Sequence, residues 1–303
     1  MPDPTLDLRG IFPPIPTPFD TAGAIDCDAL VRNLGFLSSF DLRGYVVLGS
    51  NGEAVHLSIE ERIRLLELTR SLIHEDRLLI AGTGCASTLQ TIELSKRAAG
   101  IEADAVLVLP PHYYRGRMTI EALTRHFHAV ADACGIPVII YNMPACTGMD
   151  LDAESIAAIA DHPNIFGLKD SGGDVVKLGA LHRSLGDGFQ ILAGSASFLL
   201  PALSIGAVGG VLALANIAPA QCLAIRELSQ AGDWERAREI QVRLIEANTA
   251  VTRRWGVAGL KAAMNLMGLG GGSVRAPLLN LEKHEIERLE TILIDCQVHE
   301  SVR

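Results

Sequence analysis

The chain has 303 residues, of which 26 are Lys or Arg and 35 are Asp or Glu, so its formal net charge is −9. This acidic balance, without any run of basic residues, argues against nucleic acid or an anionic membrane as a partner and favours a small molecule. The first ten residues, MPDPTLDLRG, lack the apolar core of a secretory signal and the Arg-rich character of a transit peptide, and no apolar run is long enough for a membrane span, so we expect a cytoplasmic protein.

Eight short apolar runs recur along the chain, and each has the length and composition of a buried strand. They cover residues 10–18, 43–50, 77–84, 104–111, 137–144, 164–171, 189–195 and 207–216. Amphipathic stretches separate them, and the clearest opens with a capping box between Ser58 and Glu61. Buried parallel strands that alternate with helices belong to the α/β class, and eight such units close a (β/α)8 TIM barrel. A doubly wound open sheet is the alternative.

Beyond Asn216 only helical patterns follow, over residues 232–254, 259–269 and 283–294. That is more helix than the eighth unit of a barrel needs. We therefore predict a barrel over residues 1–232 and a C-terminal helical appendage over residues 233–303.

No metal site is predicted. The six cysteines, Cys27, Cys85, Cys134, Cys146, Cys222 and Cys296, show no C-x-x-C spacing, so we expect reduced thiols. His126 and His128 lie two positions apart in a helical stretch, which directs their rings to different faces.

Polar side chains gather at the ends of five predicted strands. In a barrel of this kind the active site lies at the carboxyl ends of the strands. The residues in question are Ser50, Asn51, Glu53, His112, Tyr113, Tyr114, Tyr141, Asn142, Lys169, Asp170, Ser171, Gly194 and Ser195. We interpret Glu53 as a carboxylate that stabilises its turn rather than as a general base, and we expect His56 and His112 to line the pocket or lie at its rim.

Lys169 carries the most information, because it ends the apolar strand IFGLK. Burial of an ammonium is costly and therefore favours the neutral amine. A neutral amine can attack a carbonyl carbon to form an imine, and the imine can accept an electron pair from a bond that breaks. The alternative is a lysine that reaches solvent or pairs with Asp170. Tyr141 in VIIYN ends the preceding strand and suits a proton shuttle facing an imine, although it could also be a core tyrosine with a satisfied hydroxyl.

Three motifs resemble those of one enzyme family. GSNGE at 49–53, YNMPACTG at 141–148 and GLKDSGG at 167–173 are similar to the motifs of the pyruvate-dependent class I aldolases typified by dihydrodipicolinate synthase and N-acetylneuraminate lyase. Their order and spacing fit over essentially the whole chain. Within this family, YYRGRM, KDSGGDV, LAGSA and AVTRRWGVAGLK resemble the 4-hydroxy-2-oxoglutarate aldolases most.

The resemblance implies a role for each residue of the site. Lys169 forms the imine, Tyr141 transfers the proton, and Ser50 and Asn51 hold the pyruvyl carboxylate. Ser171 contacts the substrate, as we expect of Gly194 and Ser195 at the end of the seventh strand. Tyr113 or Tyr114 completes a proton relay from a neighbouring subunit of a homotetramer. The resemblance implies no cofactor beyond the covalent imine.

One departure from the synthases concerns the second substrate. They carry an arginine two residues after the proline of the tyrosine motif, where it binds the carboxylate of aspartate semialdehyde, and this chain has Cys146 there. A thiol cannot form the bidentate contact of a guanidinium. We therefore expect cleavage of 4-hydroxy-2-oxoglutarate to pyruvate and glyoxylate, with Ser171 and a backbone N–H near Gly194 as candidates to hold the distal carboxylate.

The alternatives are 4-hydroxy-tetrahydrodipicolinate synthase, a 2-keto-3-deoxy sugar-acid aldolase, or a non-catalytic keto-acid-binding regulator. Arg253 and Arg254 are interpreted as surface or interface cations, with a ligand role as the alternative.

Overall fold

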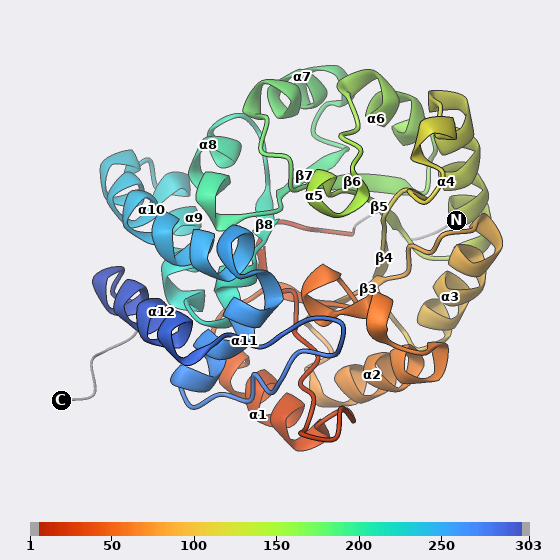
Figure 1. Ribbon diagram of the computed structural model, residues 1–303. Helices are drawn as coiled ribbons and strands as arrows, with labels where there is room; N and C mark the ends of the chain where they lie inside the picture. The colour runs from red at the N-terminus through yellow and green to blue at the C-terminus, as the bar shows by residue number, and fades with distance from the viewer. Residues whose placement is uncertain (1–5, 299–303) are drawn as a thin grey trace.

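Eight parallel strands form a barrel in the computed structural model, which describes residues 6–298 (Figure 1). The strands are β1 Ile11–Phe12, β2 Gly44–Val47, β3 Leu78–Gly82, β4 Ala105–Val108, β5 Val138–Asn142, β6 Ile165–Asp170, β7 Gln190–Ala193 and β8 Gly209–Val211. Their order is β1-β8-β7-β6-β5-β4-β3-β2. Between β2 and the segment that directly follows β1, Ile15 N donates to Val46 O at 2.8 Å and Val46 N donates to Pro13 O at 3.1 Å. These bonds bring the two outer strands together, so the fold is the predicted TIM barrel and not an open sheet.

Each strand lies within a predicted run, but the first and the last are much shorter than predicted. β1 covers Ile11–Phe12 only, because the prolines that follow it have no N–H to donate to a ladder. β8 ends at Val211, since the chain then curls into a 3₁₀ turn over Ala213–Asn216.

The helices form a ring around the barrel (Figure 1). They are α1 Cys27–Leu37, α2 Ile59–Leu72, α3 Thr88–Gly100, α4 Ile120–Cys134, α6 Ala153–Ala160, α7 Val175–Leu185, α8 Leu199–Ser204 and α9 Pro219–Gln230. The short helix α5 Pro144–Thr147 lies inside this ring, directly after β5. The predicted capping box of α2 is present: Glu61 N donates to Ser58 Oγ at 3.2 Å and Ser58 N donates to Glu61 Oε2 at 2.9 Å. The large core lies between strands and helices, and a smaller cluster that includes Phe12, Ile139 and Tyr141 fills the barrel.

The C-terminal helices, drawn in blue in Figure 1, pack against one side of the barrel. They are α10 Trp234–Thr249, a π-helical turn over Ala250–Arg254, α11 Gly256–Leu266 and α12 Lys283–Asp295. Leu244, Leu260 and Leu289 belong to the same buried cluster as the barrel helices. The division of the chain into a barrel over residues 1–232 and an appendage over residues 233–303 stays a prediction. None of the helices within residues 6–298 combines the length and apolar character that a membrane crossing requires.

Candidate active site

A cavity of about 540 Å³ opens at the carboxyl ends of the strands. Its wall includes Ser50, Asn51, Tyr141, Lys169, Ser171, Gly194 and Ser195. Of the residues to which we assigned a catalytic or substrate-binding role, all except Tyr113 and Tyr114 therefore line one cavity. Parallel strands end at the same rim of a barrel, which explains why residues so far apart in the sequence meet there.

Lys169 and Tyr141 lie side by side within this cavity. They are paired in the ladder between β5 and β6, so both side chains point to the inside of the barrel. Lys169 is 3% exposed and Tyr141 is 2% exposed. The Lys169 Nζ lies 3.8 Å from the centroid of the Tyr141 ring, and the Tyr141 hydroxyl is 3.1 Å from Ser50 Oγ. The lysine thus stays buried against the phenol and does not reach out to solvent.

Asp170 is not the partner of Lys169, because it points to the opposite face of β6. Its buried carboxylate accepts hydrogen bonds from Asn142 Nδ2 at 2.7 Å and Gly173 N at 2.9 Å, and it lies 3.2 Å from Lys177 Nζ. Lys177 Nζ also lies 2.6 Å from Asp150 Oδ1. The alternative of a Lys169–Asp170 pair is therefore wrong, and within residues 6–298 Lys169 has no carboxylate partner.

The cluster of Asn142, Asp150, Asp170 and Lys177 was missed in the sequence reasoning. Burial lowers the pKa of Lys177, but the hydrogen bonds to Asp150 and Asp170 outweigh that effect, so the pKa is raised overall. The cluster joins the ends of β5 and β6 on the face of the sheet opposite Tyr141 and Lys169. The alternation of side chains along a strand could have predicted this cluster. Asn142 and Asp170 each follow an inward-facing residue, so both should point to the outer face of the sheet.

The GSNGE segment forms a strained turn after β2. Leu48 and Glu53 adopt left-handed backbone conformations, with φ of 63° and 52°. Ser50–Gly52 forms one 3₁₀ turn between them, and the first N–H groups of such a turn have no acceptor within it. Strain of this kind is tolerated where the surrounding structure fixes the backbone, and it is common at ligand sites.

Glu53 holds the turn in place through contacts on the side away from the cavity. Its carboxylate accepts hydrogen bonds from Lys261 Nζ and, at 2.9 Å, from Arg275 N, and it lies 3.2 Å from His56 Nδ1. Glu53 is 2% exposed and does not line the cavity that contains Lys169. Burial lowers the pKa of Lys261, and the hydrogen bond to Glu53 opposes that shift. These contacts fit a carboxylate that stabilises the turn.

Ser171, Gly194 and Ser195 meet on the wall next to β6 and β7. Gly194 N donates to Asp170 O at 2.7 Å, so the N–H of Gly194 itself is not available to a ligand. The expectation that a backbone N–H near Gly194 holds the distal carboxylate stays a prediction. A Cβ atom at Gly194 would collide with Ser171 Oγ, so glycine leaves room for that hydroxyl. Ser195 Oγ accepts hydrogen bonds from Asn248 Nδ2 at 2.9 Å and Ser197 N at 3.3 Å.

Tyr113 and Tyr114 lie in the loop between β4 and α4, outside the cavity. They are 80% and 71% exposed, and their rings pack edge to face with centroids 5.0 Å apart. A role of either tyrosine in a neighbouring subunit stays a prediction.

A second cavity of about 430 Å³ adjoins the first at the ends of β2, β3 and β4. Ser50, Tyr141 and Cys146 line both cavities. His56 and His112, which we expected to line the active-site pocket or lie at its rim, line only the second cavity.

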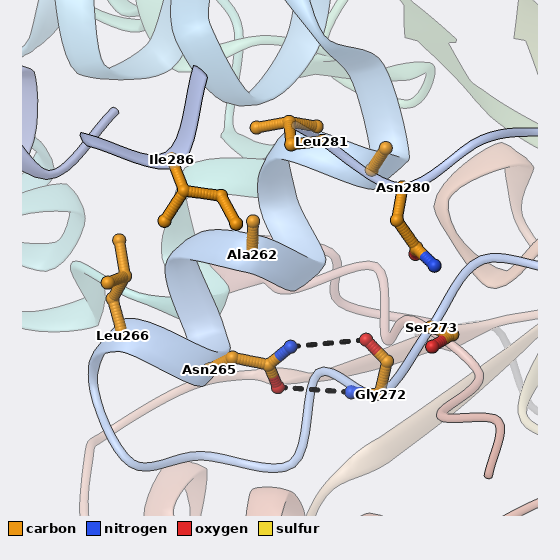
Figure 2. A pocket seen from close by; sticks show the side chains of 9 residues that line it. Ala262, Asn265, Leu266, Gly272, Ser273, Asn280, Leu281 and Ile286 are labelled. Carbon is orange, nitrogen blue, oxygen red and sulfur yellow. Dashed lines mark hydrogen bonds between the residues drawn. The ribbon is translucent and has the colours of Figure 1, made fainter. Parts of the chain in front are cut away.

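A third hollow, of about 310 Å³, lies between α11 and the segment that leads to α12 (Figure 2). Asn265 closes one side of it, because its amide donates to Gly272 O and accepts from Gly272 N, both at 3.1 Å. The described residues that line it include no titratable side chain, so it offers no acid, base or charged group for catalysis.

The two helical histidines have different neighbours. His126 Nδ1 lies 2.9 Å from Thr88 Oγ1, and His128 Nε2 lies 3.1 Å from Ile159 O. Within residues 6–298 no group of three or more His, Cys, Asp or Glu side chains is arranged to hold a metal ion.

A TIM barrel with a buried lysine, an adjacent tyrosine and a hydroxyl-bearing turn has the features of a pyruvate-dependent class I aldolase or lyase. The model of the Dihydrodipicolinate synthetase family matches residues 7–295, and the chain belongs to this family. Its members are enzymes that form a Schiff base on a lysine.

Named relatives and solved structures agree with this placement. The chain is 38% identical to a probable mitochondrial 4-hydroxy-2-oxoglutarate aldolase of Emericella nidulans, over 87% of each chain. It is 33% identical to a 4-hydroxy-tetrahydrodipicolinate synthase of Haloarcula marismortui, over 95% of this chain and 94% of that one. The solved 4-hydroxy-tetrahydrodipicolinate synthase of Methylacidiphilum fumariolicum superimposes with a TM-score of 0.91 at 33% identity, over 96% of each chain.

Proposed function

We propose that the protein cleaves 4-hydroxy-2-oxoglutarate to pyruvate and glyoxylate through an imine on Lys169. The observation that carries the proposal is the position of Lys169 Nζ, buried 3.8 Å from the centre of the Tyr141 ring, while the Tyr141 hydroxyl is 3.1 Å from Ser50 Oγ. This geometry supports the proposal, because it brings a buried amine and two neighbouring hydroxyl groups, suited to imine formation and proton transfer, together in one cavity.

The reaction begins when the Lys169 amine attacks the keto carbon of the substrate and water leaves, which gives a protonated imine. Tyr141, whose hydroxyl contacts Ser50, then takes the proton of the 4-hydroxyl group. The C3–C4 bond breaks, its electron pair moves into the imine to form an enamine, and glyoxylate leaves. C3 takes up a proton, and water hydrolyses the imine to release pyruvate and the free amine.

The imine itself accepts the electron pair, so the proposed mechanism needs no metal and no organic cofactor. The expected result is full activity after dialysis against a chelator. Restoration of lost activity by a divalent cation would show that a metal takes part.

Cys146 supports the aldolase over the synthase. It lines the active-site cavity at the position where a synthase carries its carboxylate-binding arginine. Loss of that charge-assisted contact costs about 1.5 to 3 kcal/mol, or roughly one to two decades in rate. The 38% identity to a probable 4-hydroxy-2-oxoglutarate aldolase supports the same choice. The identity to the Haloarcula marismortui enzyme keeps the synthase as the second candidate, and a 2-keto-3-deoxy sugar-acid aldolase is the third.

The decisive experiment measures catalytic efficiency for two reactions on one preparation. One is release of pyruvate and glyoxylate from 4-hydroxy-2-oxoglutarate, and the other is condensation of pyruvate with aspartate semialdehyde. We expect cleavage to be the more efficient reaction by about 10- to 100-fold. Efficient condensation with negligible cleavage would overturn the choice of substrate and leave the imine chemistry in place. A protein that forms no imine with pyruvate would instead be a binding protein.

We infer that the protein is a cytoplasmic homotetramer in which one of the two exposed tyrosines reaches a neighbour's site. The exposure of Tyr113 and Tyr114, 80% and 71%, supports this inference, because two adjacent aromatic rings in water are typical of a contact surface. Sedimentation analysis measures the assembly. Comparison of Tyr113→Phe with Tyr114→Phe in the cleavage assay identifies the tyrosine in the relay, since only that variant loses turnover.

A further inference from the structure

The charges in the active-site cavity differ in sign from those of the chain as a whole. Although the net charge is −9, the described residues that line the cavity include two basic side chains, Lys169 and Arg253, and no Asp or Glu. Lys169 lies at the floor, whereas Arg253 is an exposed residue that reaches the wall from the C-terminal helices. A cavity with this composition favours a ligand with two separate negative charges.

Arg253 reaches the cavity because the chain forms a π-helical turn there. Ala250–Arg254 is wider than an α-helical turn, and it is closed by a hydrogen bond from Trp255 N to Ala250 O at 3.2 Å. The extra width lets three consecutive residues, Val251, Thr252 and Arg253, line the same cavity. Such turns occur often at functional sites.

Asn248 fixes this turn against the barrel. It is 1% exposed, and its amide donates to Ser195 Oγ at 2.9 Å and to Ser197 Oγ at 2.6 Å, beyond the end of β7. The two hydrogen bonds hold the end of α10 to the same rim that carries Lys169. The position of Arg253 therefore depends on a buried contact rather than on a free loop.

The other candidates for the distal carboxylate are weaker. Gly194 N is bonded to Asp170 O, and Cys146 has no charge to offer. Ser171 remains, but a neutral hydroxyl forms a weaker contact with a carboxylate than a guanidinium does. Arg254 is turned away, with its Nη1 3.7 Å from Glu246 Oε1. Within the described residues, Arg253 makes no ion pair with a carboxylate, so its guanidinium is available to a ligand.

We propose that Arg253 determines specificity by binding the distal carboxylate of a 2-oxo dicarboxylic acid whose keto carbon is bound to Lys169. This inference rests on the proposed function for the identity of the substrate, because the distal carboxylate is the one that leaves in glyoxylate. It does not depend on cleavage, since any 2-oxo dicarboxylic acid of that length presents the same group.

Imine formation tests the proposal without cleavage. The proteins are wild type, Arg253→Gln, Arg253→Lys and the matched control Arg254→Gln. Each is titrated with 2-oxoglutarate, with 2-oxopentanoate, which has the same carbon chain and one carboxylate, and with pyruvate. The adduct is trapped with borohydride and measured by mass spectrometry.

We expect Arg253→Gln to raise the half-saturating concentration of 2-oxoglutarate by about 10- to 100-fold and to leave the values for 2-oxopentanoate and pyruvate unchanged. Arg253→Lys keeps the charge without the bidentate geometry and should show a smaller increase. Arg254→Gln should match the wild type with all three acids.

Two results overturn the proposal: an unchanged value for 2-oxoglutarate in Arg253→Gln, or an equal loss with all three acids, which indicates a structural role. The proposed function fails in a different way. In that case the wild type forms the imines, and Arg253 distinguishes dicarboxylic from monocarboxylic acids, but 4-hydroxy-2-oxoglutarate releases no glyoxylate.

Discussion

The amine of Lys169 lies 3.8 Å from the centre of the Tyr141 ring because the two residues are register partners in β5 and β6. Register partners in a parallel ladder point to the same face, so both side chains enter the barrel together. On the opposite face, their successors Asn142 and Asp170 are joined by a hydrogen bond of 2.7 Å. Two chemically different pairs, a lysine with a tyrosine and an amide with a carboxylate, therefore follow from a single register.

Lys169 should be the only lysine that forms an imine. The buried lysines within residues 6–298 are Lys169, Lys177 and Lys261. Lys177 is paired with Asp150 and Asp170, and Lys261 is paired with Glu53, so neither amine is free to attack a carbonyl. Reduction with borohydride in the presence of pyruvate, followed by digestion, should place the adduct in the Lys169 peptide, and Lys169→Ala should abolish it. An adduct on another lysine would contradict the mechanism.

Tyr141→Phe should separate imine formation from turnover. Removal of the phenolic hydroxyl deletes the proton-transfer group but leaves the amine in place, so trapping with pyruvate should persist while cleavage falls by about 10² to 10⁴. The matched control is Tyr45→Phe, which alters another buried tyrosine that does not line the cavity. Cleavage at the wild-type rate in Tyr141→Phe would require a different base.

Lys261→Met should destabilise the protein. The side chains of Lys261 and Glu53 are 2% and 1% exposed, so the substitution leaves a buried carboxylate without its cation and should cost about 3 to 5 kcal/mol in the free energy of unfolding. Lys283→Met is the control, because Lys283 and Glu287 form an exposed pair at 3.9 Å. Exposed pairs contribute about 0 to 1 kcal/mol. Urea unfolding measures both values, and equal losses would refute the assignment of a buried pair.

His126 should make stability depend on pH between about 6.5 and 4. Burial lowers the pKa of His126 to about 4, whereas an unfolded histidine titrates near 6.5. Above that range both states are neutral. As the pH falls through it, the unfolded state takes up the proton first, so the free energy of unfolding decreases by about 1.4 kcal/mol per pH unit, up to roughly 3 kcal/mol.

His126→Leu should flatten this dependence in urea unfolding measured at pH 7, 6, 5 and 4. His284→Gln, a change at an exposed histidine, should give a curve parallel to that of the wild type. A His126→Leu curve that is parallel as well would show that His126 does not titrate abnormally.

The sequence predicted what local patterns determine. Eight apolar runs became eight strands, and a lysine at the end of one of them lay inside the barrel, because side-chain alternation and burial are properties of the strand itself. The family resemblance assigned Ser50 and Asn51 to the same site as Lys169, and in the structure all three residues line one cavity.

What escaped prediction depends on contacts between distant segments. The pairing of Asp170 with Lys177 instead of Lys169 follows from the side of β6 on which each lysine lies. Arg253 could not be placed in the cavity from the sequence, since a π-helical turn has no clear local signature and this one is fixed by Asn248. The second cavity likewise includes Leu278, which lies far along the chain from the other residues that line it.

The salt bridge between Glu53 and Lys261 also bears on how the protein is made. The last strand ends at Val211, so a nascent chain can hold all eight strands outside the ribosome before Lys261 and Arg275 have been synthesised. At that stage Glu53 lacks the cation and the N–H group that hold the GSNGE turn in its strained form. We expect the GSNGE turn to become fixed only near the end of translation, so the unfinished barrel would lack a fixed form of this part of the proposed substrate site.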